Sequence, residues 1–329
     1  MELERTTMLV DGRVVDLAAE EAEAVAGLAG ELADGTELAS PLWMNRARTA
    51  SCALPPRVGG ALRRFRHDAG EDGVLLLKGL PLGPLPPTPG SYDSLQLYAT
   101  RPAALLVSLA LCIGEPVGFA DEKQGSLVHD VVPVPGMADF PGNAGSAPLT
   151  MHVENAFHPH RPDVIGLLCL RNDHDDAAAL RIASIRRAVR LLSGTAVEVL
   201  REPRFVTEAP ASFGPGGTAA EPHAVLYGSV EDPSIRVDFT STHAIGDAAA
   251  GALAELSGAL AEVRTDVVLA PGDLAVVDNR VALHGRSRFT PRHDGTDRWL
   301  HRIFVHVDFR ASRAWRPRGG HVVSRQAVS

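Results

Sequence analysis

Cysteine, long apolar runs and an N-terminal targeting pattern are scarce or missing in this 329-residue chain. No stretch reaches the roughly 18 uninterrupted apolar residues that a membrane span requires, so a transmembrane protein is excluded. The first residues lack the basic and apolar segments of a secretory signal. The cysteines lie in apolar contexts, form no C-x-x-C pair and suit buried thiols in a reducing cytoplasm: Cys52, Cys112 and Cys169. We therefore expect a soluble cytoplasmic protein.

An excess of positive charge is also missing. The net charge is −8 at pH 7 and the pI is near 5.9, which argues against nucleic acid or an anionic membrane as the main partner. A small-molecule substrate is expected instead, and the sequence indicates no oligomeric state. The length allows one large domain or two small ones. A single domain over 1–329 is the prediction that we carry forward.

Residues 1–116 are predicted to be mainly helical support for a later β core. Residues 17–32 are rich in Ala, Glu and Leu and predict a helix. A second helix is predicted over 56–69, with one apolar face and one basic face. A buried strand is predicted over 74–77. Residues 103–112 are apolar enough to form a buried helix.

Residues 117–310 change to short β-prone runs separated by turns, namely 127–134, 149–153, 164–170, 224–226, 235–239, 267–269, 274–277 and 299–307. Such a series predicts a sandwich or barrel. We therefore expect a mixed β fold with flanking helices around a double-stranded β-helix (jelly-roll, cupin-like) core. Helices over 185–192 and 248–263 interrupt it, and 311–329 form a C-terminal tail.

A long loop is predicted over about 203–222, between two prolines. Its centre is rich in Gly, Pro, Ala and Ser. A long loop within a compact domain is usually a functional lid or disordered. We interpret this one as a lid that closes over a bound substrate.

The motif His152-Val153-Glu154, followed far downstream by His284, is the strongest functional signal. Residues i and i+2 of an extended segment share a face, so His152 and Glu154 can reach one metal while Val153 turns into the core. His284 lies in a separate β-prone run over 274–285 and can supply the third ligand. Two imidazoles and one carboxylate are the facial triad of non-haem Fe(II) oxygenases.

The H-x-E tripeptide is weak evidence when it stands alone, because a solvated strand can carry the same residues. The distal His284 strengthens it, and so does Arg298, a cation placed to meet an anionic co-substrate beside the iron. The alternative of another class is a cupin-like metal-binding or structural protein whose triad holds Zn²⁺ or no metal.

Several segments together resemble the clavaminate-synthase-like Fe(II)/2-oxoglutarate oxygenases. They include V-V-P-V-P-G, G-N-A-G-S, H-V-E-N-A-F-H and L-C-L-R, and they span 131–136, 142–146, 152–158, 168–171, 277–286 and 291–300. The likeness runs from about 57 to 317. It implies that His152, Glu154 and His284 bind Fe(II), that Arg298 pairs with the distal carboxylate of 2-oxoglutarate, and that O2 is consumed.

The resemblance also implies a set of polar side chains that hold an amino acid: Glu122, Gln124, Asn143, Asp238 and Arg302. Arg302 would bind the α-carboxylate, because guanidinium groups match carboxylates bidentately. Glu122 and Asn143 would hold the polar ends of the amino acid, Gln124 would assist, and Asp238 would accept a hydrogen bond from a side-chain amide.

Two local patterns refine this expectation. Relatives place a threonine near Leu180-Arg181 to bind 2-oxoglutarate, whereas neither position here carries a hydroxyl. Relatives that act on arginine show two acids where this chain has Asp238-Phe239-Thr240. One acceptor suits an amide, whereas a guanidinium favours two charges. A neutral side chain is therefore expected on the substrate.

The implied activity is hydroxylation of a free amino acid at Cβ, with L-asparagine first, and conversion of 2-oxoglutarate to succinate and CO2. Another free or carrier-bound amino acid, such as arginine, citrulline or aspartate, is the alternative. Because Glu154 fills a position that is small in halogenating members of the class, hydroxylation is favoured over halogenation.

Simpler interpretations stay open for most of these residues. Arg298 and Arg302 could be ordinary exposed strand arginines. Asp238 could pair with Arg236 or cap a turn, and Asn143 could belong to a glycine-rich turn. The pair Asp278-Asn279 is predicted to be a turn without a ligand role. Ordinary surface or hydrogen-bonded roles are expected for six other histidines, His158, His160, His174, His293, His301 and His306.

Overall fold

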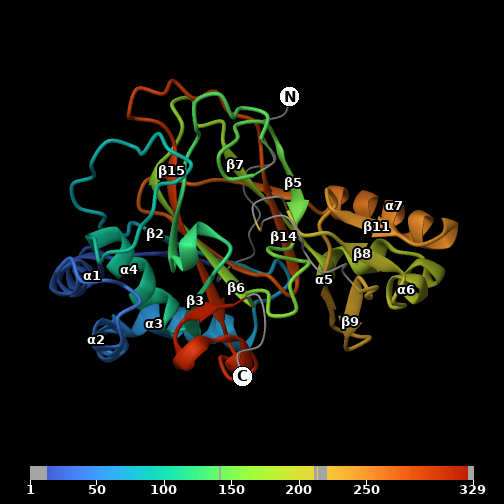
Figure 1. Cartoon of the computed structure of the whole chain (residues 1–329), viewed down its shortest axis with the longest axis horizontal. Coiled ribbons are helices and arrows are strands. Elements are labelled where there is room, and N and C mark those ends of the chain that lie inside the picture. Colours follow the sequence, from blue (N-terminus) through green and yellow to red (C-terminus); the bar gives the residue numbers. More distant parts are fainter. Residues whose placement is uncertain (1–12, 141, 211–212, 214–220, 325–329) are drawn as a thin grey trace.

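The computed structural model describes residues 13–140, 142–210, 213 and 221–324. Two β-sheets form its centre (Figure 1). The larger has eight strands in the order β1-β2-β13-β6-β15-β3-β16, and β4 also pairs with β15. Its strands are β1 Val14–Asp16, β2 Val74–Lys78, β3 Glu115–Phe119, β4 Val128–Val131, β6 Val164–Arg171, β13 Leu274–Asp278, β15 Trp299–His306 and β16 Val322–Val323.

The smaller sheet has four strands in the order β12-β7-β14-β5. They are β5 Leu149–His152, β7 Ala179–Ser184, β12 Thr265–Val268 and β14 Ala282–Arg286, and every neighbouring pair is antiparallel. The two sheets make the predicted jelly-roll core. The expectation of a mixed β fold with flanking helices is therefore confirmed.

Alternation along the strands separates two apolar cores. On β15, Leu300 and Phe304 belong to the cluster between the sheets, together with Leu180 of β7. Ile303 and Val305 belong to the larger cluster that reaches the helices. Because successive strand residues face opposite sides, Arg302 must share the inner face with Leu300 and Phe304.

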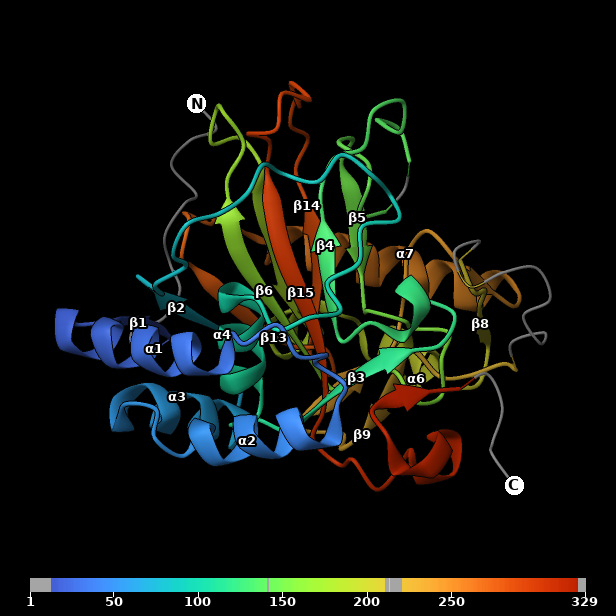
Figure 2. The ribbon, with the colours of Figure 1, turned by 60° about the vertical axis from the view of Figure 1, so that its left-hand side comes forward.

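Four helices pack beside the larger sheet, namely α1 Ala19–Leu32, α2 Pro41–Ser51, α3 Pro56–His67 and α4 Arg101–Ala110 (Figure 2). Every residue of α4 from Pro102 to Ala110 is buried, since this helix lies between α1, α2 and strands β6 and β15. A helix that is apolar on all sides requires such a central position.

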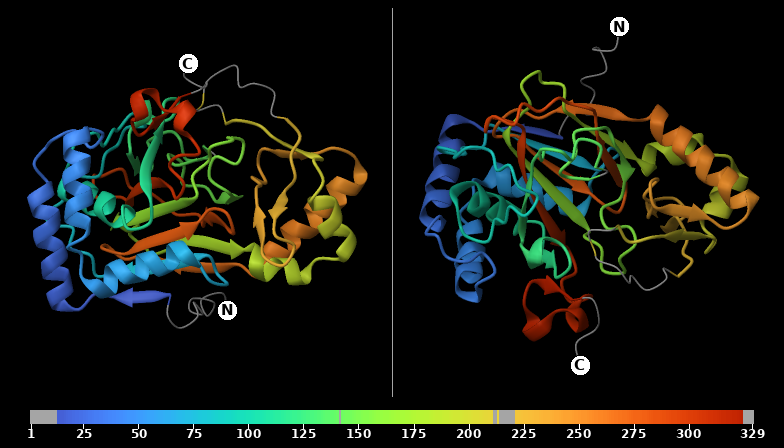
Figure 3. Two further views of the ribbon diagram at one scale, coloured as in Figure 1. Left: turned by 90° about the horizontal axis from the view of Figure 1, so that it is seen from below. Right: turned by 45° about the horizontal axis from the view of Figure 1, so that its top comes forward.

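A second helical group lies on the opposite side of the β core (Figure 3). It contains α5 Ile185–Ala188, α6 Gly194–Leu200 and α7 Asp247–Glu262. Two short ribbons accompany it, in which β8 Phe205–Thr207 pairs with β11 Thr242–Ala244 and β9 Leu226–Gly228 pairs with β10 Pro233–Ile235. Short 3-10 helices occupy Lys123–Gly125, Val189–Leu191, Arg313–Trp315 and Pro317–Gly319.

The structure corrects several local expectations. The strand predicted over 235–239 ends at Ile235, and the run that follows instead leads into a turn at 239–241. Strand β7 was absent from the predicted strands because its Ala, Leu and Arg residues do not favour strands; pairing with β12 and β14 overrides that preference. The helix α2 was not predicted.

Parts of two predictions lie outside the described residues: 211–212 and 214–220 of the expected lid, and 325–329 of the expected tail. Among the described residues, no helix has the length and apolar character needed to cross a membrane. Cys112 and Cys169 are buried free thiols as expected, whereas Cys52 is free but exposed, so burial was wrongly predicted for it.

Candidate metal and substrate site

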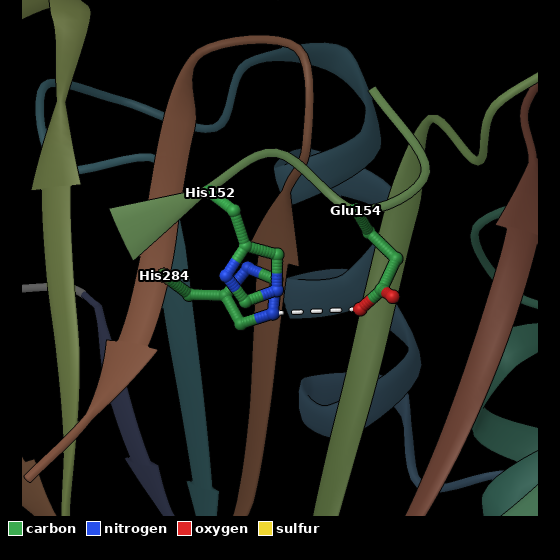
Figure 4. Close-up of side chains that lie close together, drawn as sticks. All are labelled: His152, Glu154 and His284. Atoms are coloured by element: carbon green, nitrogen blue, oxygen red, sulfur yellow. Dashed lines mark ion pairs between the residues drawn. The ribbon is translucent and has the colours of Figure 1, made fainter. Parts of the chain in front are cut away.

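His152, Glu154 and His284 come together at the edge of the smaller sheet (Figure 4). His152 of β5 lies directly opposite His284 of β14, and their ring centroids are 4.3 Å apart. Glu154 Oε2 lies 3.5 Å from His284 Nε2. One potential ligand atom from each residue falls within 4.8 Å of the other two. The register between β5 and β14 thus brings His284, which is distant in sequence, to His152 and Glu154.

Gly285 allows β5 and β14 to approach each other at this point. A Cβ atom at this position would lie 2.6 Å from the carbonyl oxygen of Leu149 on β5. The pairing register also shifts between His284 and Arg286. A larger residue at 285 would push β5 away and separate the two histidines.

The backbone around Glu154 is held from two sides. Val153 is buried as predicted, and its N–H donates to the carbonyl of Val237 at 2.8 Å. The N–H of Glu154 donates to Oδ1 of Asn279 at 2.7 Å, and Nδ2 of Asn279 donates to the Glu154 carbonyl at 3.1 Å. Asn279 is distant in sequence from Glu154, and its turn position was predicted correctly. Its role in positioning Glu154 was missed.

Asn279→Ala is expected to lower the free energy of unfolding by about 2 kcal/mol, because buried polar groups of Glu154 lose their partners. Fe(II) affinity should fall as well, since the Glu154 backbone is released. Urea denaturation and Fe(II) titration measure the two effects. Asn172→Ala is the matched control, because that amide bonds Asp176 at an exposed turn. Equal stability of the two variants would contradict the role of Asn279.

The donor atoms of the triad fit a divalent metal. His152 Nδ1 lies 2.8 Å from the carbonyl of Thr150, so it carries the proton and leaves Nε2 as a lone-pair donor. Burial, and then the neighbouring His152, lower the pKa of His284 to about 4, which keeps its imidazole neutral. Glu154 Oε2 is buried and has no hydrogen-bond partner among the residues that the structure describes. A buried carboxylate oxygen beside two imidazoles, with no hydrogen-bond donor of its own, is a donor set that a divalent cation would satisfy.

Glu154 is ionised in spite of its burial. Burial acts to raise its pKa, but Arg302 and the two histidines together hold that pKa well below the ordinary value. Only 6% of Glu154 and 5% of His284 is exposed. Two of the three triad residues are therefore buried, and His152 is partly exposed.

Arg302 links the triad to the predicted substrate residues. Its Nη1 donates to Glu154 Oε1 at 2.9 Å, and its Nη2 forms a very short ion pair with Glu122. Asn143, oriented with its amide oxygen toward Arg302, accepts from both Nη atoms at 3.0 and 3.1 Å. Arg302 is 4% exposed. The interpretation of Arg302 as an exposed strand arginine is therefore wrong, and Asn143 does more than form a turn.

His129 of β4 is a member of this cluster that sequence analysis missed. Its Nε2 lies 2.9 Å from the Ser126 carbonyl and must donate, which leaves Nδ1 to accept from Arg302 Nη2 at 2.8 Å. Burial, followed by the charge of Arg302, lowers the His129 pKa to about 3. A neutral histidine therefore helps to orient Arg302. An H-D pair within a strand carries no signal that would have revealed this contact.

Glu122 and Gln124 reach the site through an unusual turn. Lys123, Gln124 and Gly125 have positive φ angles of 47°, 55° and 77°. Only glycine adopts this region readily, so two non-glycine residues there indicate a conformation that the surroundings impose. Burial and the nearby Glu154 raise the pKa of Glu122, while Arg302 opposes the rise.

Asp238 lies next to the triad but does not pair with Arg236. Arg236 donates instead to the carbonyls of Ala156 and Phe157 at 2.6 and 3.0 Å. The alternative in which Asp238 pairs with Arg236 is therefore wrong. Asp238 accepts from the Thr240 N–H at 2.8 Å and from the Ser241 hydroxyl at 2.9 Å. The turn-cap interpretation is thus correct, and Asp238 also faces the cavity described next.

A cavity of about 640 Å³ joins most of these side chains. Of the nine predicted site residues, seven line it: Glu122, Gln124, Asn143, His152, Glu154, Asp238 and Arg302. Its other walls include Tyr92, Phe140 and Phe157. Mixed apolar walls with a few convergent polar groups are typical of small-molecule sites.

Arg298 lies apart from this lining, in a second buried cationic region. Arg298 and Arg286 are each only 5% exposed, and the ring of Phe289 lies 5.7 and 5.1 Å from their guanidinium carbons. Within the described ranges, no carboxylate forms an ion pair with either. Burial, and then the mutual repulsion, lower the Arg286 pKa to about 9. The interpretation of Arg298 as an exposed strand arginine is therefore wrong. The two buried guanidinium groups of Arg286 and Arg298 suit an anionic ligand.

Leu180 occupies the place near this pair where relatives were expected to carry a hydroxyl. It lies directly opposite Arg286 in the β7–β14 pairing and is buried between the sheets. Arg181 points to the other side, with its Nε 3.5 Å from Asp266. Arg286 was not singled out from the sequence. It is the polar residue that pairs directly with Leu180, the position where a threonine was expected in relatives.

The six histidines expected to have ordinary roles are hydrogen-bonded or ion-paired more often than they are on the surface. His158, His301 and His306 are buried, and His301 Nε2 lies 3.2 Å from Asp130. His306 contacts Ser312 and the His160 carbonyl. His174 lies near Asp294 and Asp297, a grouping that its sequence spacing did not suggest.

Comparison with known proteins places this geometry in context. Residues 46–304 match the family described as Taurine catabolism dioxygenase TauD, TfdA family. The chain is 49% identical over 283 residues to L-asparagine oxygenase of Streptomyces coelicolor, with 85% of each chain covered. It is 32% identical to clavaminate synthase 2 of Streptomyces clavuligerus, covering 86% of this chain and 89% of that enzyme.

Solved structures agree with these relationships. Asparagine oxygenase in complex with Fe(II), 2S,3S-3-hydroxyasparagine and succinate superposes with a TM-score of 0.92 at 46% identity, covering 95% of this chain and 99% of that one. The non-heme iron oxygenase OrfP in complex with Fe and alpha-ketoglutaric acid gives a TM-score of 0.86 at 31% identity, covering 94% and 99%.

Proposed function

Because this chain belongs to the TauD/TfdA family of dioxygenases, we propose that it hydroxylates free L-asparagine at Cβ, forming succinate and CO2 from 2-oxoglutarate. The observation that carries the proposal is the match to asparagine oxygenase over nearly the whole chain, at 46% identity and a TM-score of 0.92. The single acid at Asp238 supports a carboxamide substrate. We treat the whole chain as one oxygenase domain.

His152, Glu154 and His284 would hold Fe(II). Iron bound there, with 2-oxoglutarate and O2, supplies the oxidising chemistry that places an oxygen atom on an unactivated C–H bond. The protein contributes position and exclusion of water. Burial of Glu154 and His284, together with the clamp from Asn279, keeps the donor atoms in one arrangement before any ligand arrives.

Arg298 would pair with the distal carboxylate of 2-oxoglutarate, with Arg286 beside it. Two buried guanidinium groups that pair with no carboxylate of the described residues leave a net positive charge that an anion would neutralise. Guanidinium groups also match carboxylates in geometry. Arg286 would supply donors near Leu180, where relatives use a hydroxyl.

Arg302 and Glu122 would hold the zwitterionic end of the amino acid. Arg302 already donates to Glu154, Glu122 and His129, and its buried Nε has no acceptor. Glu122 Oε2 also has no hydrogen-bond partner within the described part of the chain. An unsatisfied donor and an unsatisfied acceptor in one cluster fit an α-carboxylate and an α-ammonium group. Asn143 lies against Arg302 and would contact the same end.

Asp238 would accept the side-chain carboxamide N–H at the other end of the cavity. Its backbone pairs with that of His152. The functional group of the substrate would thus lie beside the first metal ligand, which brings Cβ close to the metal. Fixing a C–H bond in this way is the main contribution that a protein makes to such a reaction.

Incubation with Fe(II), 2-oxoglutarate, O2 and a panel of amino acids tests the proposal. Mass spectrometry should detect a gain of one oxygen on L-asparagine and little on aspartate, arginine or citrulline. An anaerobic sample with Fe(II) and 2-oxoglutarate should show a weak visible charge-transfer band. A protein that held Zn²⁺ or no metal would show neither signal, and faster turnover of arginine would reassign the substrate alone.

Arg298→Ala is expected to weaken 2-oxoglutarate binding by about 1.5 to 3 kcal/mol, the usual loss for a hydrogen bond to a charged group. The charge-transfer band, titrated with 2-oxoglutarate under anaerobic conditions, measures this affinity. Arg181→Ala is the matched control, because Arg181 points away from the inner face and lies near Asp266. If both variants bind 2-oxoglutarate equally well, the anion lies elsewhere.

A further inference from the structure

A chain of hydrogen bonds runs from the main chain of Asp238 to His223. The N–H of Asp238 is 3.0 Å from Thr242 Oγ1, which is 2.8 Å from Thr207 Oγ1. Thr207 Oγ1 is in turn 2.8 Å from His223 Nε2, and His223 Nδ1 is 2.9 Å from the Ala224 carbonyl. Both threonines are buried.

The chemistry of the end groups determines the direction of every bond in this chain. The Ala224 carbonyl can only accept, so His223 Nδ1 donates and Nε2 of the neutral ring must accept. Thr207 therefore donates to His223 and accepts from Thr242. Thr242 donates to Thr207 and accepts from the Asp238 N–H. Each hydroxyl gives one hydrogen bond and receives one, and no member can reverse without leaving a buried group unpaired.

Strand pairing holds the members of the chain at this spacing. Thr207 of β8 and Thr242 of β11 are direct partners. Phe205 and His223 exchange backbone hydrogen bonds of 3.1 and 2.7 Å, which ties residue 223 to the start of β8. Asp238 itself is paired with His152 through the backbone. The chain therefore connects the metal-ligand segment with residues 205–207 and 223.

We propose that Thr242, Thr207 and His223 form a positioning unit that sets the orientation of Asp238 and so determines selectivity for a side-chain carboxamide. This inference rests on the proposed function, in which Asp238 accepts the amide of the substrate. The carboxylate of Asp238 is bonded to its own turn, at Thr240 and Ser241. Its direction therefore follows that turn, and Thr242 anchors the turn at the Asp238 N–H.

The unit would act by positioning Asp238. Of the four hydrogen-bonded residues, Thr207 and Asp238 line the cavity, whereas Thr242 and His223 do not. An acceptor that selects a polar group must be held in a narrow range of positions. Loss of the anchor would let Asp238 move, which would weaken amide binding without affecting the Arg298 region. A residue that only stabilised the fold would not change selectivity in this way.

Paired substitutions separate these possibilities. Thr242→Val and His223→Leu remove one member each with little change in size. Thr242→Ser keeps the hydroxyl, and His223→Gln keeps an acceptor near the position of Nε2. The measurement is the dissociation constant of L-asparagine, from the change that it causes in the anaerobic Fe(II)·2-oxoglutarate charge-transfer band, followed by KM and kcat. Thermal unfolding and 2-oxoglutarate affinity are recorded for every variant.

Thr242→Val and His223→Leu are each expected to weaken L-asparagine binding about five- to tenfold, the effect of one lost hydrogen bond. The KM should rise while kcat changes less, and 2-oxoglutarate affinity should stay within about twofold of wild type. Thr242→Ser and His223→Gln should recover most of the affinity. The double variant should be no weaker than the single ones, because members of one unit are not additive.

Asparagine affinity equal to wild type in both Thr242→Val and His223→Leu would overturn the inference. So would a parallel loss of 2-oxoglutarate and asparagine affinity, which indicates general loosening. If Thr242→Val fails to fold, His223→Leu against His223→Gln decides the question. Absence of any asparagine response in the wild-type protein is a different result, because it removes the proposed function on which the unit depends.

Discussion

Replacement of His152 by alanine is expected to abolish succinate formation and amino-acid hydroxylation together. The variant would leave one histidine and one carboxylate, His284 and Glu154, of the three residues whose ligand atoms lie within 4.8 Å of one another. His152 is partly exposed and ends a strand, so its removal should cost little packing. Succinate release and the thermal unfolding midpoint measure the two effects.

Glu154→Gln tests the same metal site at its buried carboxylate ligand. The amide keeps the size of the side chain but loses the charge to which Arg302 donates, so we expect both loss of activity and a lower unfolding temperature. His243→Ala serves as the control, since that histidine is 59% exposed in its side chain and does not line the cavity. Turnover retained in both His152→Ala and Glu154→Gln would defeat the triad assignment.

Asp238→Asn should lower kcat/KM for L-asparagine about 10- to 100-fold, the usual effect of losing a hydrogen bond to a charged group. Wild-type protein should reject L-aspartate, because a second carboxylate facing Asp238 meets repulsion in a partly desolvated pocket. The variant should gain turnover of L-aspartate, since the new amide can donate to that acid. Competition between the two amino acids, followed by mass spectrometry, gives the ratio directly.

Two controls make the Asp238 result interpretable. Asp266→Asn changes an acid outside the cavity and should leave the ratio unchanged. The unfolding midpoint of Asp238→Asn must also be recorded, because an amide can replace only one of the two hydrogen bonds that the carboxylate accepts from Thr240 and Ser241. An unchanged asparagine-to-aspartate ratio would remove Asp238 from substrate recognition.

The triad could be anticipated because its spacing is a property of extended backbone. His152 and Glu154 alternate with the buried Val153, and the distal His284 lies in an apolar run that had to become a strand. The jelly-roll core followed from the series of short β-prone runs. These are local signals, readable without knowledge of which strands pair.

Contacts that depend on pairing register could not be anticipated. Nothing near His129 or Asn279 in sequence indicates that the first meets Arg302 and the second holds the backbone of Glu154. The strand β7 was missed for the same reason, because its neighbours β12 and β14 come about 80 to 100 residues later and overrule its weak local preference. The burial of Arg298 and Arg302 is likewise a property of the assembled sheets.

The register of β5 also limits how the length of the chain can vary. This strand has four residues and lies at the edge of its sheet, yet it carries His152 opposite His284. Since side chains alternate with a period of two, one residue inserted or deleted between Leu149 and Glu154 would turn a ligand to the outer face. The described residues of the stretch that precedes β5, 132–140 and 142–148, form no helix or strand. Changes in length are therefore excluded in the few residues that follow Leu149, and before Leu149 they are tolerated only where Asn143 keeps its contact with Arg302.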